Sequence, residues 1–241
     1  MPVDTAKIKV FIDFDGTIAV KDVGASLFIE YGEENRVNEI ISLYRNGEIN
    51  ARETWFELIK TLRTNDLSEI MNFTGSFDLD PYFEDFARFL TQNEIEFFIL
   101  SDGFSFYIEQ LLKKYNLENV NYFSNQLNFN GVNWEVNFSL TDEECQKCAH
   151  CKRNRVLDLS GDDEYTIYIG NGGSDFCPAE FCDSVFAKDQ LARHCEKNGI
   201  DYHPFKNFSD VKKVVESLIN RNRLRKKHRP AIKRKQVYQS G

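Results

Sequence analysis

Two carboxylates one residue apart, Asp13 and Asp15, follow an apolar run at residues 8–12. If that run is a β-strand, residues two apart point to the same side, so both carboxylates project together from the strand end. Like charges held close raise each other's pKa. A protein tolerates this where a divalent cation binds, or where one carboxylate is a nucleophile and the other an acid or base. The alternative is an Asp-rich turn, at which Gly16 permits a sharp bend.

Four other polar residues stand at the ends of apolar runs or at the start of a following helical pattern. They are Ser101, Lys152, Asn171 and Asp175. In an open α/β sheet, ligands bind beyond the carboxyl ends of the strands. The placement of these residues is therefore the one that a single shared site requires.

The elements that would position these residues can be read from the apolar pattern. Near-continuous apolar runs recur at 8–12, 95–100, 165–169 and 184–187, with helical patterns between them. Buried runs that alternate with helices predict a parallel sheet in a three-layer α/β domain.

The segment between the first two strands is too long for one crossover connection. It contains helical patterns at 35–44 and 51–62. We expect a helical cap at 21–76, inserted into a core domain made of residues 1–20 and 77–220.

Further elements follow in the second half of the core. Helical patterns occur at 82–91, before the second strand, and at 211–219. Alternating patterns on both sides of Asn130 and Gly131 predict a β-hairpin. We interpret the hairpin as an extension of the core sheet, although its position before Lys152 leaves open a part in covering the site.

The run from Asp13 to Thr17, Asp-Phe-Asp-Gly-Thr, resembles the first motif of the haloacid dehalogenase (HAD) superfamily. Its three other motifs have counterparts in the expected order: Ser101 after a strand, Lys152 at a helix start, and Gly-Asn-Gly-Gly-Ser-Asp at 170–175. The resemblance implies an HAD-like, Rossmannoid parallel sheet with a helical cap after the first strand. It also implies that the cap closes over the site and excludes water.

The resemblance assigns a role in phosphate-ester hydrolysis to each motif residue. Asp13 is expected to be the nucleophile that forms an aspartyl-phosphate, and Asp15 the acid and base. Ser101 and Lys152 are expected to hold the phosphoryl oxygens and offset their charge. The expected ligands of a Mg²⁺ cofactor are Asp13, Asp15, Asn171 and Asp175.

Substrate contacts are expected beside the motifs and from the cap. The predicted phosphate or substrate contacts near the motifs are Gly16, Thr17, Asp102 and Gly103. In or next to the cap, Asp22 and Arg52 are candidates for contacts with the leaving group. Each has the alternative of an ordinary solvated helix residue.

Asn171 departs from the family pattern. The superfamily has an acid at this place that binds the metal directly, and Asn offers one neutral carbonyl oxygen instead. The exchange removes a negative charge, so magnesium affinity could fall and Asp175 could take a larger part. A catalytically weak or silent HAD-fold binding protein is therefore the alternative to an active enzyme.

Three stretches extend the resemblance to the phosphoserine-phosphatase-like branch. They are the Cys-rich approach to Lys152, residues 169–178 and residues 183–188. Within that branch the chain is most similar to the methionine-salvage 2-hydroxy-3-keto-5-methylthiopentenyl-1-phosphate phosphatases and to the phosphoethanolamine/phosphocholine phosphatases. The implied function is hydrolysis of a small phosphorylated metabolite, whose identity the sequence does not give.

Three cysteines stand directly before Lys152, at Cys145, Cys148 and Cys151. Two overlapping Cys-x-x-Cys spacings could supply three zinc ligands, with the fourth drawn from His150, Cys177 or Cys182. A reduced structural cluster or a labile disulfide is an equal alternative.

Composition bounds the remaining possibilities. With 41% apolar residues in 241, the chain can bury a sizeable core, and no apolar run approaches a membrane span. We expect a cytoplasmic protein with no membrane partner. Nine of the 30 basic residues lie at 221–241, which holds no acid, so the rest of the chain has a net charge of −17.

That acidic body argues against nucleic acid as a partner. We interpret 221–241 as a basic, flexible tail or as an intramolecular counterweight to the acidic surface of the body. Binding of RNA, DNA or anionic lipid by this segment is the less favoured alternative. The oligomeric state stays open.

Overall fold

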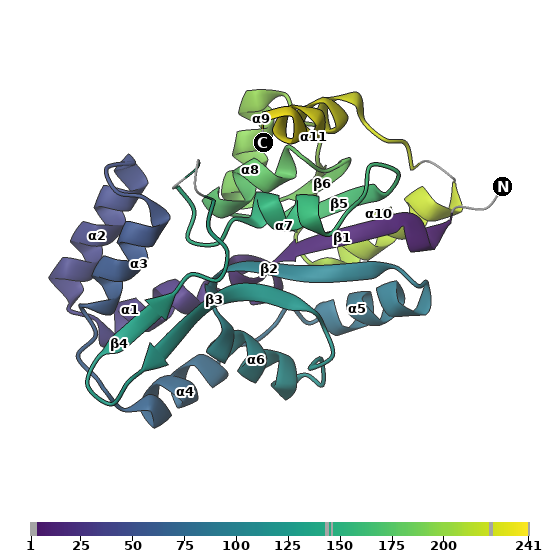
Figure 1. The fold of residues 1–241 in the computed structure, drawn as a ribbon. Helices are drawn as coiled ribbons and strands as arrows, with labels where there is room; N and C mark the ends of the chain where they lie inside the picture. Colours follow the sequence, from purple (N-terminus) through teal and green to yellow (C-terminus); the bar gives the residue numbers. More distant parts are fainter. Residues whose placement is uncertain (1–3, 143–144, 146, 222–223, 241) are drawn as a thin grey trace.

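The computed structural model describes residues 4–142, 145, 147–221 and 224–240. Within them, one seven-stranded sheet has the order β4-β3-β2-β1-β5-β6-β7, and every neighbouring pair is parallel except β3 and β4 (Figure 1). The strands are β1 Ile8–Asp13, β2 Glu96–Phe104, β3 Tyr122–Phe129, β4 Trp134–Asn137, β5 Tyr165–Gly170, β6 Ser184–Ala187 and β7 His203–Pro204. The four predicted strands are confirmed.

Helices cover both faces of the sheet. Successive residues of a strand point to opposite faces, so a strand that is apolar throughout needs helices packed on both sides. Val10 and Ile12 of β1 belong to one apolar cluster, whereas Phe11 belongs to another. The first cluster includes residues of α5 Phe83–Gln92, α6 Ser105–Lys114 and α10 Phe208–Asn220. The second includes residues of α7 Lys152–Asp158, α8 Phe176–Ala179 and α9 Asp189–Asn198. The predicted three-layer α/β fold is confirmed.

The segment between β1 and α5 is helical, as the sequence indicated. Its helices are α1 Val23–Tyr31, α2 Glu34–Asn46, α3 Ala51–Ile59 and α4 Leu67–Gly75. Polar side chains satisfy the free N–H groups at three of these helix starts: Asp22 accepts from Ala25 N, Asn50 forms a capping box with Glu53, and Asp66 caps α4. The division into core and cap domains stays a prediction.

The hairpin predicted around Asn130 and Gly131 is present as β3 and β4. Because β3 pairs in parallel with β2, the hairpin extends the core sheet. It also contacts the inserted helices: the indole N–H of Trp134 donates to Thr64 O at 3.1 Å, and Phe138 packs edge-on against Phe56. The hairpin therefore joins the sheet to the helical insertion.

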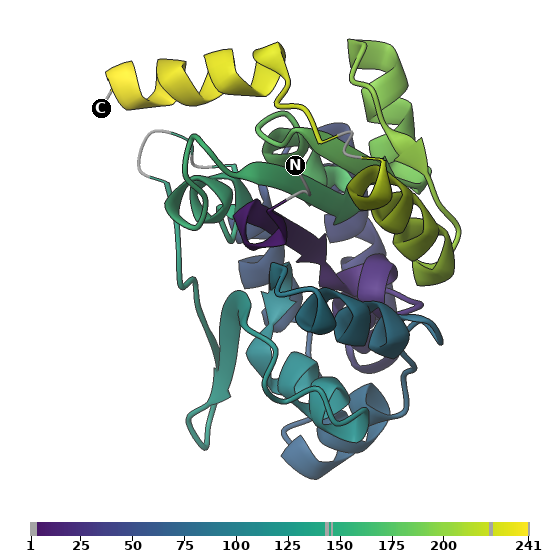
Figure 2. The same cartoon turned by 90° about the vertical axis from the view of Figure 1, so that its right-hand side faces the viewer.

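Most of the predicted basic tail is helical in the structure, and its flexibility stays a prediction. Residues 228–240 form helix α11, His228–Ser240, which lies over the end of the molecule that carries α8 and α9 (Figures 1 and 2). Lys226 Nζ donates to Asp162 O and Glu164 O at 2.8 and 2.6 Å, and Lys227 N donates to Asp183 Oδ1 at 2.9 Å. Basic residues of the segment also form ion pairs with three acids of the body, Asp183, Asp201 and Glu180.

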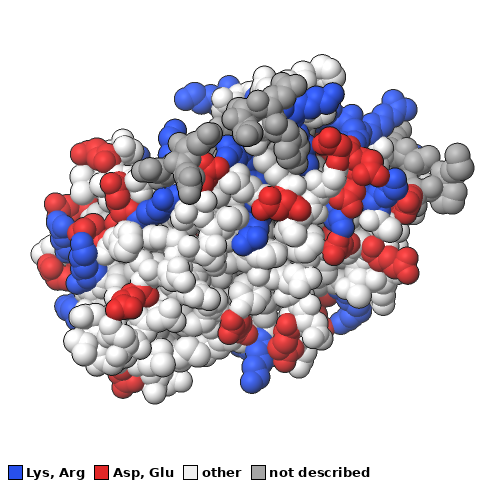
Figure 3. Space-filling model, viewed as in Figure 1, with Lys and Arg blue, Asp and Glu red and all other residues white. Residues whose placement is uncertain are grey.

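The surface carries charges of both signs beside α11 and around the helical insertion, and a broad area without charged side chains crosses the lower middle of the face in Figure 3. In the part of the chain that the structure describes, no helix combines the length and apolarity needed to cross a bilayer.

Candidate active site

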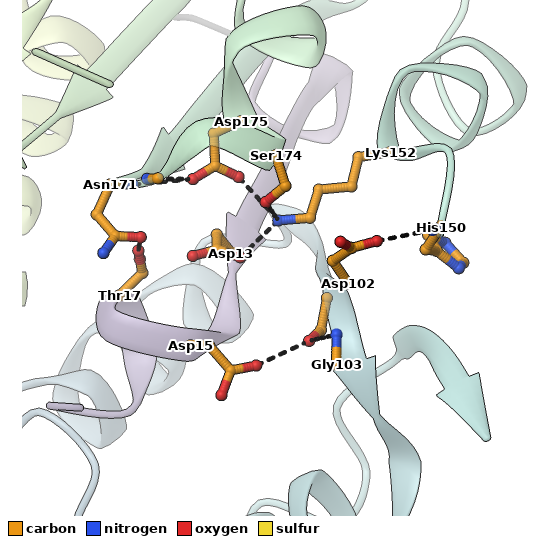
Figure 4. A network of polar contacts seen from close by, with 12 residues as sticks. Asp13, Asp15, Thr17, Asp102, Gly103, His150, Lys152, Asn171, Ser174 and Asp175 are labelled. Carbon is orange, nitrogen blue, oxygen red and sulfur yellow. Dashed lines mark hydrogen bonds and ion pairs between the residues drawn. The ribbon is translucent and has the colours of Figure 1, made fainter. Parts of the chain in front are cut away.

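The motif residues meet at one edge of the sheet. Asp13 ends β1, whose neighbours in the sheet are β2 and β5. Because all three strands are parallel, the polar residues that end or follow them come together (Figure 4). Ser101 lies within β2, and Asn171 directly follows β5.

Lys152 is the centre of this cluster. Its Nζ lies 2.5 Å from Asp13 Oδ1, 2.8 Å from Asp175 Oδ1 and 3.0 Å from Ser174 Oγ, and its side chain is only 1% exposed. Lys152 is the first residue of α7, so the helix start aims the ammonium group across the ends of β1 and β5 (Figure 4).

The charges of the cluster shift one another's pKa. Burial raises the pKa of Asp13 to about 8 and the nearby Asp175 carboxylate adds to this, whereas the Lys152 ammonium opposes it. Burial lowers the pKa of Lys152, but the two carboxylates outweigh burial and the net shift is upward. The close contact between Lys152 Nζ and Asp13 Oδ1 favours the ionised form of both groups.

Asp15 is held by four donors. Its Oδ1 accepts from the backbone N–H groups of Val23 and Gly24 at 2.9 and 3.4 Å, and its Oδ2 accepts from Ser101 Oγ at 3.2 Å and Tyr107 Oη at 2.8 Å. Burial raises the pKa of Asp15 to about 7, with a further contribution from the charge of Asp22, and the hydrogen bonds lower it in part. A carboxyl group that titrates near neutral pH is suited to general acid and base work.

Two glycines leave the room that this packing needs. Gly16 has φ +74°, and a Cβ there would lie 2.4 Å from Asn171 Nδ2. A Cβ on Gly103 would lie 1.6 Å from Tyr107 Oη and 2.7 Å from Asp15 Oδ2. Both positions are therefore restricted to glycine by close approach of neighbouring side chains.

The four predicted metal ligands differ in what they can offer. Both oxygens of Asp175 are taken, Oδ1 by Lys152 and Tyr168 Oη, and Oδ2 by the N–H groups of Asn171 and Gly172 at 2.9 Å each. The oxygens of Asp15 are likewise engaged. Asp175 thus orients Lys152 and fixes the loop after β5 through the N–H groups of Asn171 and Gly172. Each of its two carboxylate oxygens already accepts two hydrogen bonds, so neither is available to a metal ion.

Asp13 and Asn171 keep donors that suit a hard cation. The contacts of the described residues occupy Asp13 Oδ1 and leave Oδ2 available, while Asn171 Oδ1 accepts only from Thr17 Oγ1, at 3.1 Å. Among the described residues, no group of three His, Cys, Asp or Glu side chains is placed to hold a metal ion. This donor set fits Mg²⁺, which commonly retains waters and takes further ligands from substrate phosphate.

The remaining predicted contacts have mixed positions. Asp102 borders the cluster, where its Oδ1 accepts from His150 N at 2.7 Å (Figure 4) and burial raises its pKa to about 6. Asp22 caps α1 and acts on Asp15 through its charge. Arg52 is not directed at the cluster: its guanidinium donates to Cys148 O at 2.9 Å and Asp142 O at 3.3 Å.

Several residues of the site carry no motif that would mark them in the sequence. Tyr107 bonds Asp15, Ser174 bonds Lys152, and Tyr168 bonds Asp175. From the helical insertion, Trp55 packs against Phe104 with ring centroids 4.9 Å apart, just past Ser101 on β2. Ser174 could have been found inside the fourth motif, but the tyrosines sit among ordinary core positions of a helix and a strand.

The cysteines before Lys152 are free thiols. All six cysteines of the chain are free, and Cys151 is buried at the start of α7. Burial raises the pKa of Cys148 to about 12, so its thiol stays protonated. Among the described residues, Cys145, Cys148 and Cys151 belong to no group of three or more His, Cys, Asp or Glu side chains that could hold a metal ion.

Comparisons with known proteins agree with this arrangement. A family described as "Putative Phosphatase" matches residues 8–195. Two curated relatives are named 2-hydroxy-3-keto-5-methylthiopentenyl-1-phosphate phosphatase. The protein from Lysinibacillus sphaericus is 31% identical over 220 residues, which cover 88% of this chain and 96% of that protein. The protein from Bacillus mycoides is 31% identical over 215 residues, which cover 88% of this chain and 97% of that protein. A solved structure described as a phospho-aspartyl intermediate analogue of phosphoserine phosphatase has the same fold, with TM-score 0.67 and 16% identity over 87% of this chain and 97% of that one.

Proposed function

Because this chain belongs to the phosphatase family that matches residues 8–195, within the HAD superfamily, we propose that it hydrolyses its substrate through an aspartyl-phosphate on Asp13 with Mg²⁺ as cofactor. The protein is a phosphatase of small phosphorylated metabolites. The observation that carries the proposal is the contact of Lys152 Nζ with Asp13 Oδ1, which pairs a buried carboxylate with a cation at the end of β1.

The first half-reaction uses Asp13 and Asp15. The carboxylate of Asp13 attacks the phosphorus atom and forms a P–O bond, while the bond to the ester oxygen breaks. Asp15, protonated in a fraction of molecules near neutral pH because burial raises its pKa to about 7, gives its proton to the departing alkoxide. The products of this step are an alcohol and an acyl phosphate.

The second half-reaction returns the enzyme to its starting state. Asp15, now ionised, takes a proton from a water molecule that attacks the same phosphorus atom, and the acyl P–O bond breaks. Inorganic phosphate leaves, Asp13 is a carboxylate again and Asp15 is protonated. Lys152, which reaches Asp13, Ser174 and Asp175, is positioned to balance the charge of the phosphoryl oxygens.

Asp13 and Asn171 would hold the magnesium ion. When bound, the ion supplies positive charge to the phosphoryl group and orients it. The neutral Asn171 gives this site less negative charge than the family pattern, so we expect a higher magnesium requirement than an acid would produce.

The names of the relatives suggest the first substrate to test. Both relatives are named as phosphatases of 2-hydroxy-3-keto-5-methylthiopentenyl-1-phosphate, a phosphomonoester of a small apolar-tailed metabolite. Trp55, which packs on Phe104 beside the site, offers an apolar contact for such a leaving group.

The test is phosphate release from a panel of small phosphomonoesters that includes this compound, with magnesium and with a chelator. We expect magnesium-dependent release from at least one ester by the wild-type protein and by the control variant Asp163→Asn, whose carboxylate is exposed at the surface. Asp13→Asn should abolish it. Absence of release from every ester, together with tight binding of one of them, would favour the silent binding protein.

A further inference from the structure

Arg234 of the C-terminal helix is buried in the body of the protein. It is 2% exposed, although it belongs to the most basic segment of the chain. Its Nε donates to Phe181 O at 3.1 Å, its Nη1 to Ser160 O at 3.2 Å and its Nη2 to Ser160 Oγ at 2.7 Å. A planar guanidinium with a fork of donors can bind two separate chain segments at once.

The two segments that Arg234 binds are the ends of two short helices. Ser160 follows α7, and its Oγ donates back to Val156 O at 2.5 Å in the last turn. Phe181 follows α8 and its C-cap, Glu180. The guanidinium therefore binds the chain just past the C-cap of each helix, where its positive charge faces the negative end of the helix dipole.

The same two helices deliver catalytic charges at their other ends. Lys152 is the first residue of α7, and Asp175 is the N-cap of α8. Their side chains are joined by the 2.8 Å contact of Lys152 Nζ with Asp175 Oδ1. One helix pair is thus tied at its start by the ion pair of the site and at its end by Arg234.

We propose that Arg234 is a positioning residue, which holds α7 and α8 together so that Lys152 stays in contact with Asp13 and Asp175. Its effect on turnover rests on the proposed function, whereas its effect on the helix pair does not. Loss of the guanidinium leaves the acceptors at Ser160 and Phe181 buried without a donor, a state that costs free energy and favours separation of the helix ends.

Two other polar contacts of α11 reach α8 or α9 but not α7. Lys233 pairs with Glu180, and Arg229 Nη1 donates to Asn198 O and Gly199 O at 2.9 and 3.2 Å. Both are contacts to α8 or α9 near the surface. In the described part of the chain, the hydrogen bonds from α11 to Ser160 come from Arg234, while Val237 packs against the apolar cluster that contains Val156 of α7.

The first test is amide hydrogen exchange in Arg234→Ala, Arg234→Lys and the matched control Lys235→Ala, whose side chain is exposed in the same helix. We expect faster exchange in peptides covering residues 152–160 and 175–181 in Arg234→Ala, a smaller increase in Arg234→Lys, and none in the control. This readout needs no substrate. Unchanged exchange in both segments of folded Arg234→Ala would overturn the proposal.

The second test is turnover. A small displacement of Lys152 should lower kcat by roughly ten- to a hundredfold in Arg234→Ala, with a much smaller change in KM. Millimolar guanidinium, which fits the vacated site, should restore part of kcat in Arg234→Ala and do nothing for Lys235→Ala. A fall in activity that follows only the folded fraction and is not rescued would contradict the positioning role. A wild-type protein without turnover would count against the proposed function, and the exchange data would still decide the role of Arg234.

Discussion

Lys152 Nζ and Asp13 Oδ1 lie 2.5 Å apart in a place where the lysine side chain is 1% exposed and the aspartate side chain 6%. A buried ion pair is weak evidence for stability by itself, but removal of one partner leaves the other as an uncompensated buried charge. Under the proposed function, loss of the pair has two measurable consequences, one in turnover and one in folding.

Replacement of Lys152 by Met tests both consequences. It leaves Asp13 and Asp175 as neighbouring buried carboxylates, so we expect loss of detectable turnover and destabilisation by about 3–5 kcal/mol. Without the ammonium group, which lowers it, the pKa of Asp13 in the folded state rises further above its unfolded value, so the folded state binds more protons and its stability falls as pH rises. Urea unfolding at pH about 5 and about 8 should show the smaller loss at the lower pH.

The control for this substitution is Lys235→Met, which removes the same charge from an exposed position. It should change the free energy of unfolding by less than about 0.5 kcal/mol. An equal loss of stability at both pH values in Lys152→Met would show that removal of the ammonium group does not raise the pKa of Asp13 in the folded state.

Tyr107→Phe should move the alkaline limb of the pH profile. Tyr107 Oη donates to Asp15 Oδ2 at 2.8 Å and lowers the pKa of Asp15, which burial holds at about 7. Without this bond the pKa of Asp15 rises, so the acid keeps its proton to higher pH. A hydrogen bond of about 1 kcal/mol corresponds to a shift of under about one pH unit.

The measurement is kcat as a function of pH for the wild-type protein and for Tyr107→Phe. A matched control is Tyr115→Phe, because the Tyr115 hydroxyl bonds the exposed Asp78. A limb that stays in place, or that moves toward lower pH, would contradict the assignment of Asp15 as the acid.

Asn171→Asp should tighten magnesium binding. Asn171 Oδ1 already accepts from Thr17 Oγ1 at 3.1 Å, and a carboxylate can accept the same bond while adding a negative charge beside the ion. A titration of activity against magnesium should give a lower half-saturating concentration than the wild-type protein, with Asn137→Asp on the exposed hairpin as the control. An unchanged or higher value would mean that Asn171 does not contact the ion.

Removal of residues 221–241 should destabilise the protein and lower its turnover. The composition of this segment predicts a flexible tail, but the structure buries Arg234, and Lys227 N donates to Asp183 Oδ1. We expect a lower Tm and a kcat no higher than that of Arg234→Ala. A shortened protein with wild-type Tm and kcat would instead support the interpretation of residues 221–241 as a flexible tail without a structural role.

The sequence predicts the strands and the site centre well, for a physical reason. The buried strands are continuous apolar runs. Charged residues that follow these runs, such as Asp13 at a strand end and Lys152 at a helix start, are rarely buried unless they are paired with an opposite charge. The order of parallel strands then brings them together without further information.

The remaining features depend on contacts that have no sequence signature. Arg52 and Arg234 both bind backbone carbonyls, which every residue possesses, so neither target could be read from residue types. Tyr107 reaches Asp15 because α6 begins directly after β2, the strand that pairs with β1. Asp175 matches the motif of a metal ligand, yet its oxygens are taken by donors whose position follows from the loop after β5.

The central claim is that Asp13 carries the phosphoryl group during turnover. The most direct measurement is mass spectrometry of the protein quenched with acid while it hydrolyses a good substrate, followed by digestion and treatment with hydroxylamine, which cleaves acyl phosphates. We predict one phosphoryl group on the peptide that contains Asp13, sensitive to hydroxylamine and missing in Asp13→Asn. Full turnover with no phosphoryl group on that peptide, or undiminished activity of Asp13→Asn, would contradict the account.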